Sequence, residues 1–260
     1  MGIATDTPSV KAVLDALEIA LSKHQNLDVI TLTANGEPTL YPELGALVDA
    51  ILQIPNRPKL LILSNGSTIS DGAIQAILSK IDIVKLSLDC VSPKCFKKLD
   101  RAHKGIDIGQ IIEGMKHFRA RYQGELVIET LVVEGLNDTE EEFRALNAVL
   151  HEINPDRIDV GTIDRPPAYE VKGVSIERLV ELSNILEDLH VNIAYKKNYI
   201  SQKRYFSEEE IYELLKRRPQ SFEDIALCFD EQSLENLNHL VSENSLHVKK
   251  IAGVNFYKVT

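Results

Sequence analysis

Cysteine is scarce in this 260-residue chain, tryptophan is absent, and no apolar stretch reaches the length of a membrane span. The three cysteines, Cys90, Cys95 and Cys228, are too few and too scattered for the disulfide framework of a small secreted protein. They indicate buried or partly exposed thiols in a reducing compartment. The opening residues, Met1–Ser9, lack the basic and apolar regions of a signal peptide. We therefore expect a cytoplasmic protein with no membrane segment.

Positive charge is also in deficit, with 29 Lys and Arg residues against 39 Asp and Glu residues and a formal net charge of -10. That balance argues against broad electrostatic binding to nucleic acid or to anionic membranes, although a local basic patch is compatible with it. The hydrophobic content of 44% is sufficient for a full core. A chain of this length accommodates one large domain and a small second one.

Apolar residues at helical spacing alternate along the chain with short β-rich runs, a pattern typical of parallel sheets whose crossovers are helices. The helices are expected at about 10–21, 43–52, 69–78, 109–121, 140–153 and 175–189, and the strands at 27–33, 59–63, 83–88, 125–133 and 157–162. This alternation predicts an α/β fold. Its five strands favour an α/β barrel or an open partial barrel.

The most informative segment is Thr31–Leu40, where an apolar strand ends in Gly36-Glu37-Pro38-Thr39 and a helix follows. Gly36 has no side chain to block the approach of a ligand to the backbone, and Pro38 biases Glu37 toward an extended conformation. In repeated βα folds, binding sites gather at the carboxyl ends of the strands. The alternative interpretation is a turn that only links strand to helix.

Polar or glycine-rich clusters follow the other predicted strands as well. They are Asn65-Gly66 after the second, Ser87 and Asp89 around the third, Glu134 to Asp138 after the fourth, and Thr162 to Pro167 after the fifth. Taken singly, each cluster is also explained as a turn or a helix cap. Because the carboxyl ends of parallel strands meet at one edge, the coincidence of five such clusters predicts a site there.

Two further residues are candidates for that site. Glu129 lies inside the apolar run Leu126–Val133 and needs a partner, since an unpaired buried carboxylate is costly. We favour a hydrogen bond between Glu129 and a ligand, and pairing with an internal Arg or Lys is the alternative. Arg165, followed by Pro166-Pro167, lies on a stiff loop and suits an anionic group, although a surface Arg is an equally ordinary interpretation.

The ordered succession of these motifs resembles the radical SAM superfamily, specifically a group of Fe-S oxidoreductases distantly similar to wyosine-type tRNA-modifying enzymes. The segments that carry the resemblance lie in residues 8–190: Ile30–Tyr41, Leu63–Gly66, Lys85–Asp89, Ile128–Asp138 and Thr162–Ala168. The resemblance implies a partial (β/α) barrel in which a 4Fe-4S cluster, fed by an external electron donor, reductively cleaves S-adenosylmethionine (SAM).

Roles follow from the resemblance position by position. Gly36-Glu37-Pro38, with Thr39 beside it, resembles the motif that hydrogen-bonds the methionine amino group of SAM. Asn65, Ser87 and Asp89 resemble strand-end residues near its ribose and carboxylate, and Val133 with Gly135 resembles the backbone against its adenine. Arg165 is then a candidate for the substrate side. In such a site the cofactor performs the chemistry while the protein holds it in register.

The sequence departs from the family in one respect. Such enzymes bind their cluster through Cys-x3-Cys-x2-Cys after the first barrel strand, and this motif is absent here. Cys90 and Cys95 have the wrong spacing and position. The first strand and the cluster loop of the family also have no counterpart, so the expected fold is a radical SAM core lacking its first strand. A shortened or misassigned start is the favoured explanation, and a genuine cluster-free relative is the alternative.

The expected function is therefore that of a radical SAM protein that, when complete, modifies an unknown substrate, whereas this chain alone is inactive. A catalytically dead scaffold that binds SAM or a partner is the second hypothesis. The predicted division is a barrel over 1–196, a linker over 197–205 and a winged-helix-like domain over 206–260. A nucleic-acid adaptor led by that last domain is the third hypothesis.

The predicted winged helix rests on helical patterns at 207–217, 221–228 and 232–243, followed by a hairpin around Ala252-Gly253. Ser207 and Ser221 each precede a carboxylate, as helix starts prefer. Residues 203–260 hold eight Lys and Arg against ten Asp and Glu residues, whereas a DNA-binding module is usually basic. We favour protein docking over RNA binding for this domain, although Arg217, Arg218, Lys249 and Lys250 leave a local patch for RNA open.

Overall fold

A computed structural model of the protein describes residues 7–24, 27–34, 36–163, 171–194, 203–217, 219–251 and 254–259. The chain divides into two compact units, one of residues 1–162 and 173–194, and one of residues 163–172 and 195–260. Arg165, Pro166, Pro167 and the turn at Ala252-Gly253 lie outside the described residues.

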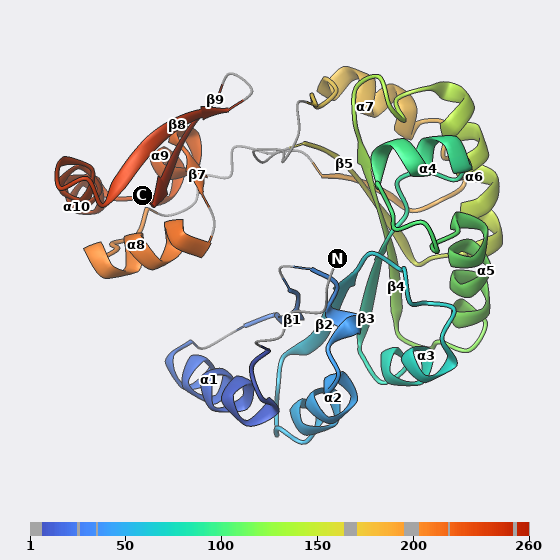
Figure 1. Cartoon of the computed structure of the whole chain (residues 1–260), viewed down its shortest axis with the longest axis horizontal. Helices are drawn as coiled ribbons and strands as arrows, with labels where there is room; N and C mark the ends of the chain where they lie inside the picture. Colours follow the sequence, from blue (N-terminus) through green and yellow to red (C-terminus); the bar gives the residue numbers. More distant parts are fainter. Residues whose placement is uncertain are drawn as a thin grey trace. The chain divides into compact units, whose positions relative to one another are not determined.

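The first unit is built on one six-stranded sheet in which every neighbouring pair is parallel and the strands follow one another in chain order. The strands are β1 (Val29–Leu32), β2 (Lys59–Ser64), β3 (Ile83–Ser87), β4 (Glu125–Val132), β5 (Arg157–Thr162) and β6 (Val191–Ala194). This order is that of a barrel wall, and the sheet curves accordingly in Figure 1. The structure thus has the α/β fold expected of a partial barrel.

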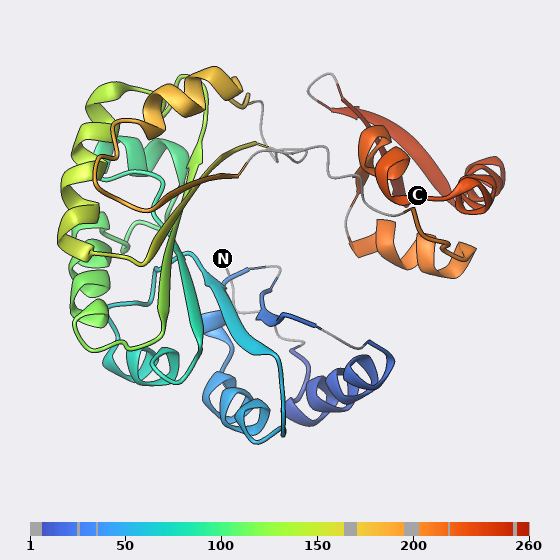
Figure 2. The same ribbon diagram turned by 180° about the vertical axis from the view of Figure 1, so that it is seen from behind.

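Helices lie along the convex face of this sheet, as both views show (Figures 1 and 2). They are α1 (Val10–Lys23), α2 (Leu44–Leu52), α3 (Gly72–Leu78), α4 (Pro93–Leu99), α5 (Ile108–Arg119), α6 (Glu140–Ile153) and α7 (Ile176–Ser183), with a short 3-10 helix η1 (Pro38–Leu40) after β1. Alternate strand residues such as Val84, Leu86, Ile128 and Val160 are fully buried in the core against them. Because side chains alternate along a strand, the residues between them face the opposite side of the sheet.

Local signals explain why these helices begin where they do. The side chains of Ser9, Asp71, Asp107 and Thr139 each accept a hydrogen bond from the first turn of α1, α3, α5 and α6. At the other end of α6, Asn154 adopts a left-handed conformation with φ of 54°, which ends the helix before β5.

Three elements differ most from the sequence prediction. Val191–Ala194 was not among the five predicted strands, yet it pairs in parallel with β5 and completes a six-stranded sheet. Helix α4 was not expected, although Ser92 caps it and Pro93 occupies its first turn. Helix α7 was expected to reach residue 189 but ends at Ser183, and turns follow.

The second unit has its own small core around Ile211, Leu215, Phe229 and Leu237. Its elements are α8 (Glu208–Arg217), β7 (Gln220–Ser221), α9 (Phe222–Cys228), α10 (Glu231–Ser242), β8 (Leu246–Ile251) and β9 (Val254–Val259). The three strands form an antiparallel sheet in the order β7-β9-β8. Ser221 and Asp224 cap α9 reciprocally. The three predicted helices are therefore present, and the two strands of the predicted hairpin pair antiparallel as far as Ile251 and Val254.

Within the part of the chain that the structure describes, each helix is too short or too polar to traverse a lipid bilayer.

Candidate functional site

The strand ends of the first unit bring most of the predicted residues to one edge of the sheet. Glu129 of β4 is in register with Ser87 at the end of β3 and with Asp159 of β5, and Asp159 is in register with Asn192 of β6. These side chains belong to the set that faces away from the helices. The concave face of the sheet therefore carries a polar row that runs from the end of β3 to the middle of β4 and the first halves of β5 and β6.

Glu37 is fixed at this edge by three hydrogen bonds. Its Oε1 accepts from the amide of Thr39 at 3.0 Å and from the hydroxyl of Thr39 at 2.6 Å. Its Oε2 accepts from the amide of Asn65 at 2.7 Å, so the carboxylate joins the loop after β1 to the end of β2. The Thr39 hydroxyl in turn lies 2.5 Å from that of Thr68. Pro38 begins η1 beside it and is buried with Thr39.

The turn after β2 requires its glycine. Gly66 has a φ of 72°, and a Cβ atom there would lie 3.0 Å from the Met115 Cε atom. The side-chain oxygen of Asn65 accepts from the amide of Ser67 at 2.9 Å. Gly36 differs, because a Cβ atom built there meets nothing within 4 Å, so the space beside the loop after β1 is open. Asn65 and Gly66 thus form a turn, and the amide of Asn65 also donates a hydrogen bond to Glu37.

Asp89 lies just beyond β3, and its Oδ1 accepts from the amide of Leu131 at 2.8 Å. Loss of hydration, followed by the negative charges of Asp100 and Glu129, raises the pKa of Asp89 to about 8 despite that hydrogen bond. A carboxyl with this pKa is mostly protonated at neutral pH, so it can donate a hydrogen bond as well as accept one.

Asn137 joins the ends of β3 and β4, a role that the sequence analysis did not assign. Its fully buried side chain donates to the carbonyl oxygens of Asp89 and Leu131, both at 2.8 Å, and accepts from the amide of Val133 at 2.8 Å. Gly135 has a φ of 72° and open space at its Cβ position. The backbone of residues 133–135 is therefore held in a defined turn at the site edge.

Glu129 has an internal partner, which was the alternative to the favoured ligand contact. Lys85 Nζ lies 2.7 Å from Glu129 Oε1 and 2.9 Å from Asp159 Oδ2. Asp159 also accepts from Arg157 Nε at 2.9 Å. Burial alone would lower the pKa of Lys85, but its hydrogen bonds to Glu129 and Asp159 raise it above the usual value. A contact between Glu129 and a ligand stays a prediction.

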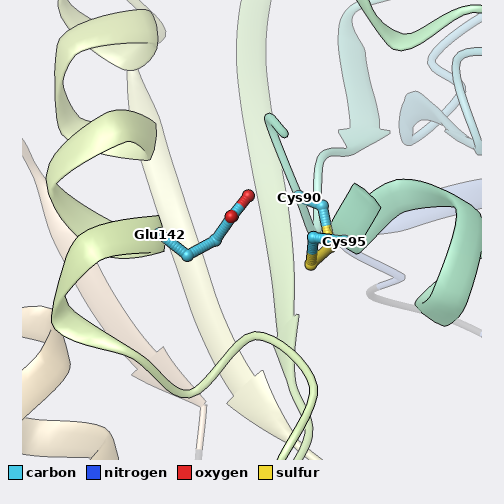
Figure 3. Close-up of side chains that lie close together, drawn as sticks. All are labelled: Cys90, Cys95 and Glu142. Atoms are coloured by element: carbon cyan, nitrogen blue, oxygen red, sulfur yellow. A yellow bond between two sulfur atoms is a disulfide. The ribbon is translucent and has the colours of Figure 1, made fainter. Parts of the chain in front are cut away.

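The cysteines differ from the expected thiols. Cys90 and Cys95 are joined in a disulfide between the end of β3 and the first turn of α4, and both are buried (Figure 3). Cys228 is exposed in the second unit. The turn into α4 brings the two Cα atoms to 5.7 Å, which is within the usual range of a disulfide.

A 4Fe-4S cluster does not fit these cysteines. A cluster with one open iron needs three thiolates around it, whereas two of the sulfurs here are bonded to each other and the third belongs to the other unit. SAM needs no thiolate, and the fixed carboxylate of Glu37 beside open space at Gly36 does fit an amino acid ligand.

Comparison with known proteins gives the same family as the motifs. A family model described as the radical SAM superfamily matches residues 3–146. A UPF0026 protein of Helicobacter pylori (strain ATCC 700392 / 26695) is 36% identical over 251 residues, which are 95% of this chain and 81% of that protein. A GTP 3',8-cyclase of Streptomyces coelicolor is 27% identical over 154 residues, which are 59% of this chain and 43% of that protein.

Solved structures share the fold at low sequence identity. A radical SAM methyltransferase from Sphaerobacter thermophilus superposes with a TM-score of 0.58 and 17% identity over 72% of this chain and 57% of that one. SuiB of Streptococcus suis bound to S-adenosylmethionine superposes with a TM-score of 0.58 and 18% identity over 79% of this chain and 48% of that one. This chain thus spans about half the length of these two neighbours.

Proposed function

We propose that this chain, which belongs to the radical SAM superfamily, binds S-adenosylmethionine at the carboxyl edge of its parallel sheet. The family uses SAM together with a 4Fe-4S cluster. The site of this proposal consists of Gly36, Glu37, Pro38 and Thr39 after β1, Asn65 after β2, Ser87 and Asp89 at β3, and Glu129, Val133 and Gly135 at and after β4.

The hydrogen bonding of Glu37 is the observation that carries the proposal. A carboxylate offers about four acceptor positions, and three are taken by Thr39 and Asn65. The position that is left, on Oε2, suits one N–H of an ammonium group, the group by which SAM presents its methionine end. The three donors also fix the orientation of the carboxylate before a ligand arrives, which lowers the entropic cost of binding.

The other end of the ligand has a matching surface. In this proposal the adenine lies against Val133 and Gly135, where the missing side chain of Gly135 leaves room for a flat ring. A protonated Asp89 donates a hydrogen bond to the SAM carboxylate or ribose. Ser87, the last residue of β3 and two positions before Asp89, supplies a hydroxyl.

Reductive cleavage of SAM by this chain alone is not part of the proposal. The 4Fe-4S cluster supplies that electron transfer in the family, and the cysteines of these 260 residues do not fit it. The residues present bind and orient SAM. We expect no 5'-deoxyadenosine from the purified chain when it is incubated anaerobically with SAM, iron, sulfide and a strong reductant, and its formation would contradict this part of the proposal.

Isothermal titration of the chain with SAM tests the binding. We expect Glu37→Gln to weaken binding about tenfold or more, because a hydrogen bond to a charged group contributes about 1.5–3 kcal/mol. Glu141→Gln, an exposed position in the first turn of α6, makes the same chemical change and should bind like the wild type. The absence of SAM binding to the wild type, or equal binding by Glu37→Gln, would overturn the proposal, provided that circular dichroism shows the variants folded.

For the second unit we propose a winged-helix fold that docks a protein partner. Three helices, a hairpin and a short third strand support the assignment. His247, Lys249 and Lys258 lie exposed on one face of the hairpin, since His247 and Lys258 are paired in register. Because this face carries two lysines, RNA is the alternative to a protein partner. RNA binding that weakens steeply with salt and is lost in Lys249→Glu would favour the adaptor hypothesis instead.

A further inference from the structure

Three side chains with metal-binding atoms converge beside the site edge without belonging to the proposed SAM site. Cys90 follows β3, Cys95 lies in the first turn of α4, and Glu142 lies in the first turn of α6. The two sulfurs and a carboxylate oxygen lie within 4.8 Å of one another. Figure 3 shows the carboxylate of Glu142 extended from its helix toward the cysteine pair.

The position of Glu142 is built by the cysteine loop itself. Its Oε1 accepts from the amides of Val91 at 2.7 Å and Ser92 at 3.0 Å, and its Oε2 accepts from the Ser92 hydroxyl at 2.8 Å. These donors lie between the two cysteines in sequence, so the loop that carries the sulfurs also orients the carboxylate. Oε2 retains one acceptor position, which is available to a cation.

We propose that, when the disulfide is reduced, Cys90, Cys95 and Glu142 bind one Zn²⁺ ion. Two thiolates and a carboxylate are ligands that Zn²⁺ accepts in tetrahedral sites, and a water molecule fills the fourth position. Zn–S and Zn–O bonds are about 2.3 Å and 2.1 Å long. Because the donor atoms lie within 4.8 Å of one another, one ion can reach all three after small side-chain movements. Both sulfurs are buried, which shields the metal from competing ligands in solvent.

The disulfide and the metal exclude each other, because each sulfur uses the same electrons for the S–S bond or for the Zn–S bond. Reduction by a phosphine breaks the S–S bond and gives two thiols, while the phosphine takes the oxygen of a water molecule and becomes the phosphine oxide. Zn²⁺ then displaces the two thiol protons, so binding weakens as the pH falls. This proposal stands apart from SAM binding, since it uses none of the SAM-site residues.

Anaerobic titration of the full chain with Co²⁺ tests the proposal, because Co²⁺ reports thiolate ligation by a charge-transfer absorption. After reduction and removal of the phosphine, we expect one Co²⁺ per chain with this absorption, displaced by one equivalent of Zn²⁺. The air-oxidised wild type should show no such absorption. Cys228→Ser is the matched control for loss of a cysteine and should behave like the wild type.

Variants of the three ligands identify the site. Cys95→Ser should abolish the charge-transfer absorption of a two-thiolate site, and Glu142→Gln should weaken Co²⁺ binding about tenfold or more while keeping the absorption. The absence of thiolate ligation in the reduced wild type would overturn the proposal, as would full binding by Cys95→Ser. The comparison between oxidised and reduced wild type needs no substitution, so it stays decisive even where a variant fails to fold.

Discussion

Two carboxylates, Glu37 and Asp89, lie after β1 and β3 at the same edge of the sheet, and the fold treats them differently. Glu37 receives three hydrogen bonds from Thr39 and Asn65. Asp89 receives one, from the amide of Leu131, and faces the like charges of Asp100 and Glu129, with a pKa raised to about 8. The two carboxylates therefore differ in how firmly their surroundings hold them, since three donors orient Glu37 and one donor orients Asp89.

This difference assigns complementary tasks to the two ends of the proposed ligand. In the proposed complex, the oriented, multiply bonded carboxylate of Glu37 would accept from the ammonium group of SAM. A protonated Asp89 would donate to the negatively charged carboxylate of SAM, which an ionised Asp would repel. Lys85 forms ion pairs with Glu129 and Asp159 and so offsets part of the negative charge on the concave face of the sheet.

The largest expected effect comes from removing the link that holds the Asp89 end together. Asn137→Ala deprives two carbonyl oxygens and the amide of Val133 of their hydrogen bonds. We expect the free energy of unfolding to fall by about 3 kcal/mol or more, since each buried backbone group left without a partner costs about 1–3 kcal/mol. Urea denaturation at pH 7 measures it.

Asn147→Ala in α6 is the matched control. Its side-chain oxygen is buried without a hydrogen-bond partner among the described residues, so the same truncation breaks no comparable link. A loss in Asn137→Ala no larger than in Asn147→Ala would show that the two strand ends do not depend on the Asn137 side chain.

The second effect depends on pH and isolates Asp89. Its pKa is raised from 3.8 to about 8, so between these values the folded state binds more protons than the unfolded state and stability falls as the pH rises. Asp89→Asn removes this pH-dependent loss of stability and can keep the hydrogen bond from the Leu131 amide. The gain in unfolding free energy should therefore be absent below about pH 4, grow through neutral pH and reach its full value above about pH 8. Because Asp89 is partly exposed, solvent screening limits the full gain to about 2 kcal/mol.

Urea denaturation of the wild type and Asp89→Asn across that pH range measures the effect, with Asp28→Asn as the control at an exposed carboxyl. A difference between wild type and Asp89→Asn that stays constant with pH would mean that Asp89 titrates in the folded protein as it does in the unfolded chain.

Much of the fold follows from local pattern. Residues 140–153 and 157–162 form α6 and β5 with the predicted bounds, because helical spacing, a Thr139 cap and a β-rich run are each visible within a few residues. Strand β6 was missed because it has only four residues, too few to establish a two-residue period. Its pairing with β5 decides its structure, and that pairing is non-local.

The candidate site also has features that follow from local sequence and features that depend on non-local packing. Which residues reach the edge was predictable, since the ends of successive parallel strands coincide there. Which partner each side chain takes was not, because the Lys85–Glu129 ion pair depends on packing across neighbouring strands. The bond between Cys90 and Cys95 depends on the turn into α4, an unexpected helix. Partner choice is a property of the folded arrangement, so motif position alone cannot specify it.

The smallest effect tests the Glu37 end of the comparison. Glu37→Gln keeps one carbonyl oxygen but turns an amide N–H₂ toward either Thr39 or Asn65, so one side of the three-donor arrangement loses its acceptor. We expect a loss of about 1 kcal/mol in unfolding free energy, the net value of a typical hydrogen bond. Urea denaturation without ligand measures it. A loss as large as that of Asn137→Ala would mean that Glu37 chiefly stabilises the contact between the loop after β1 and the end of β2. A small loss of stability together with weakened SAM binding would instead show that Glu37 acts mainly on the ligand.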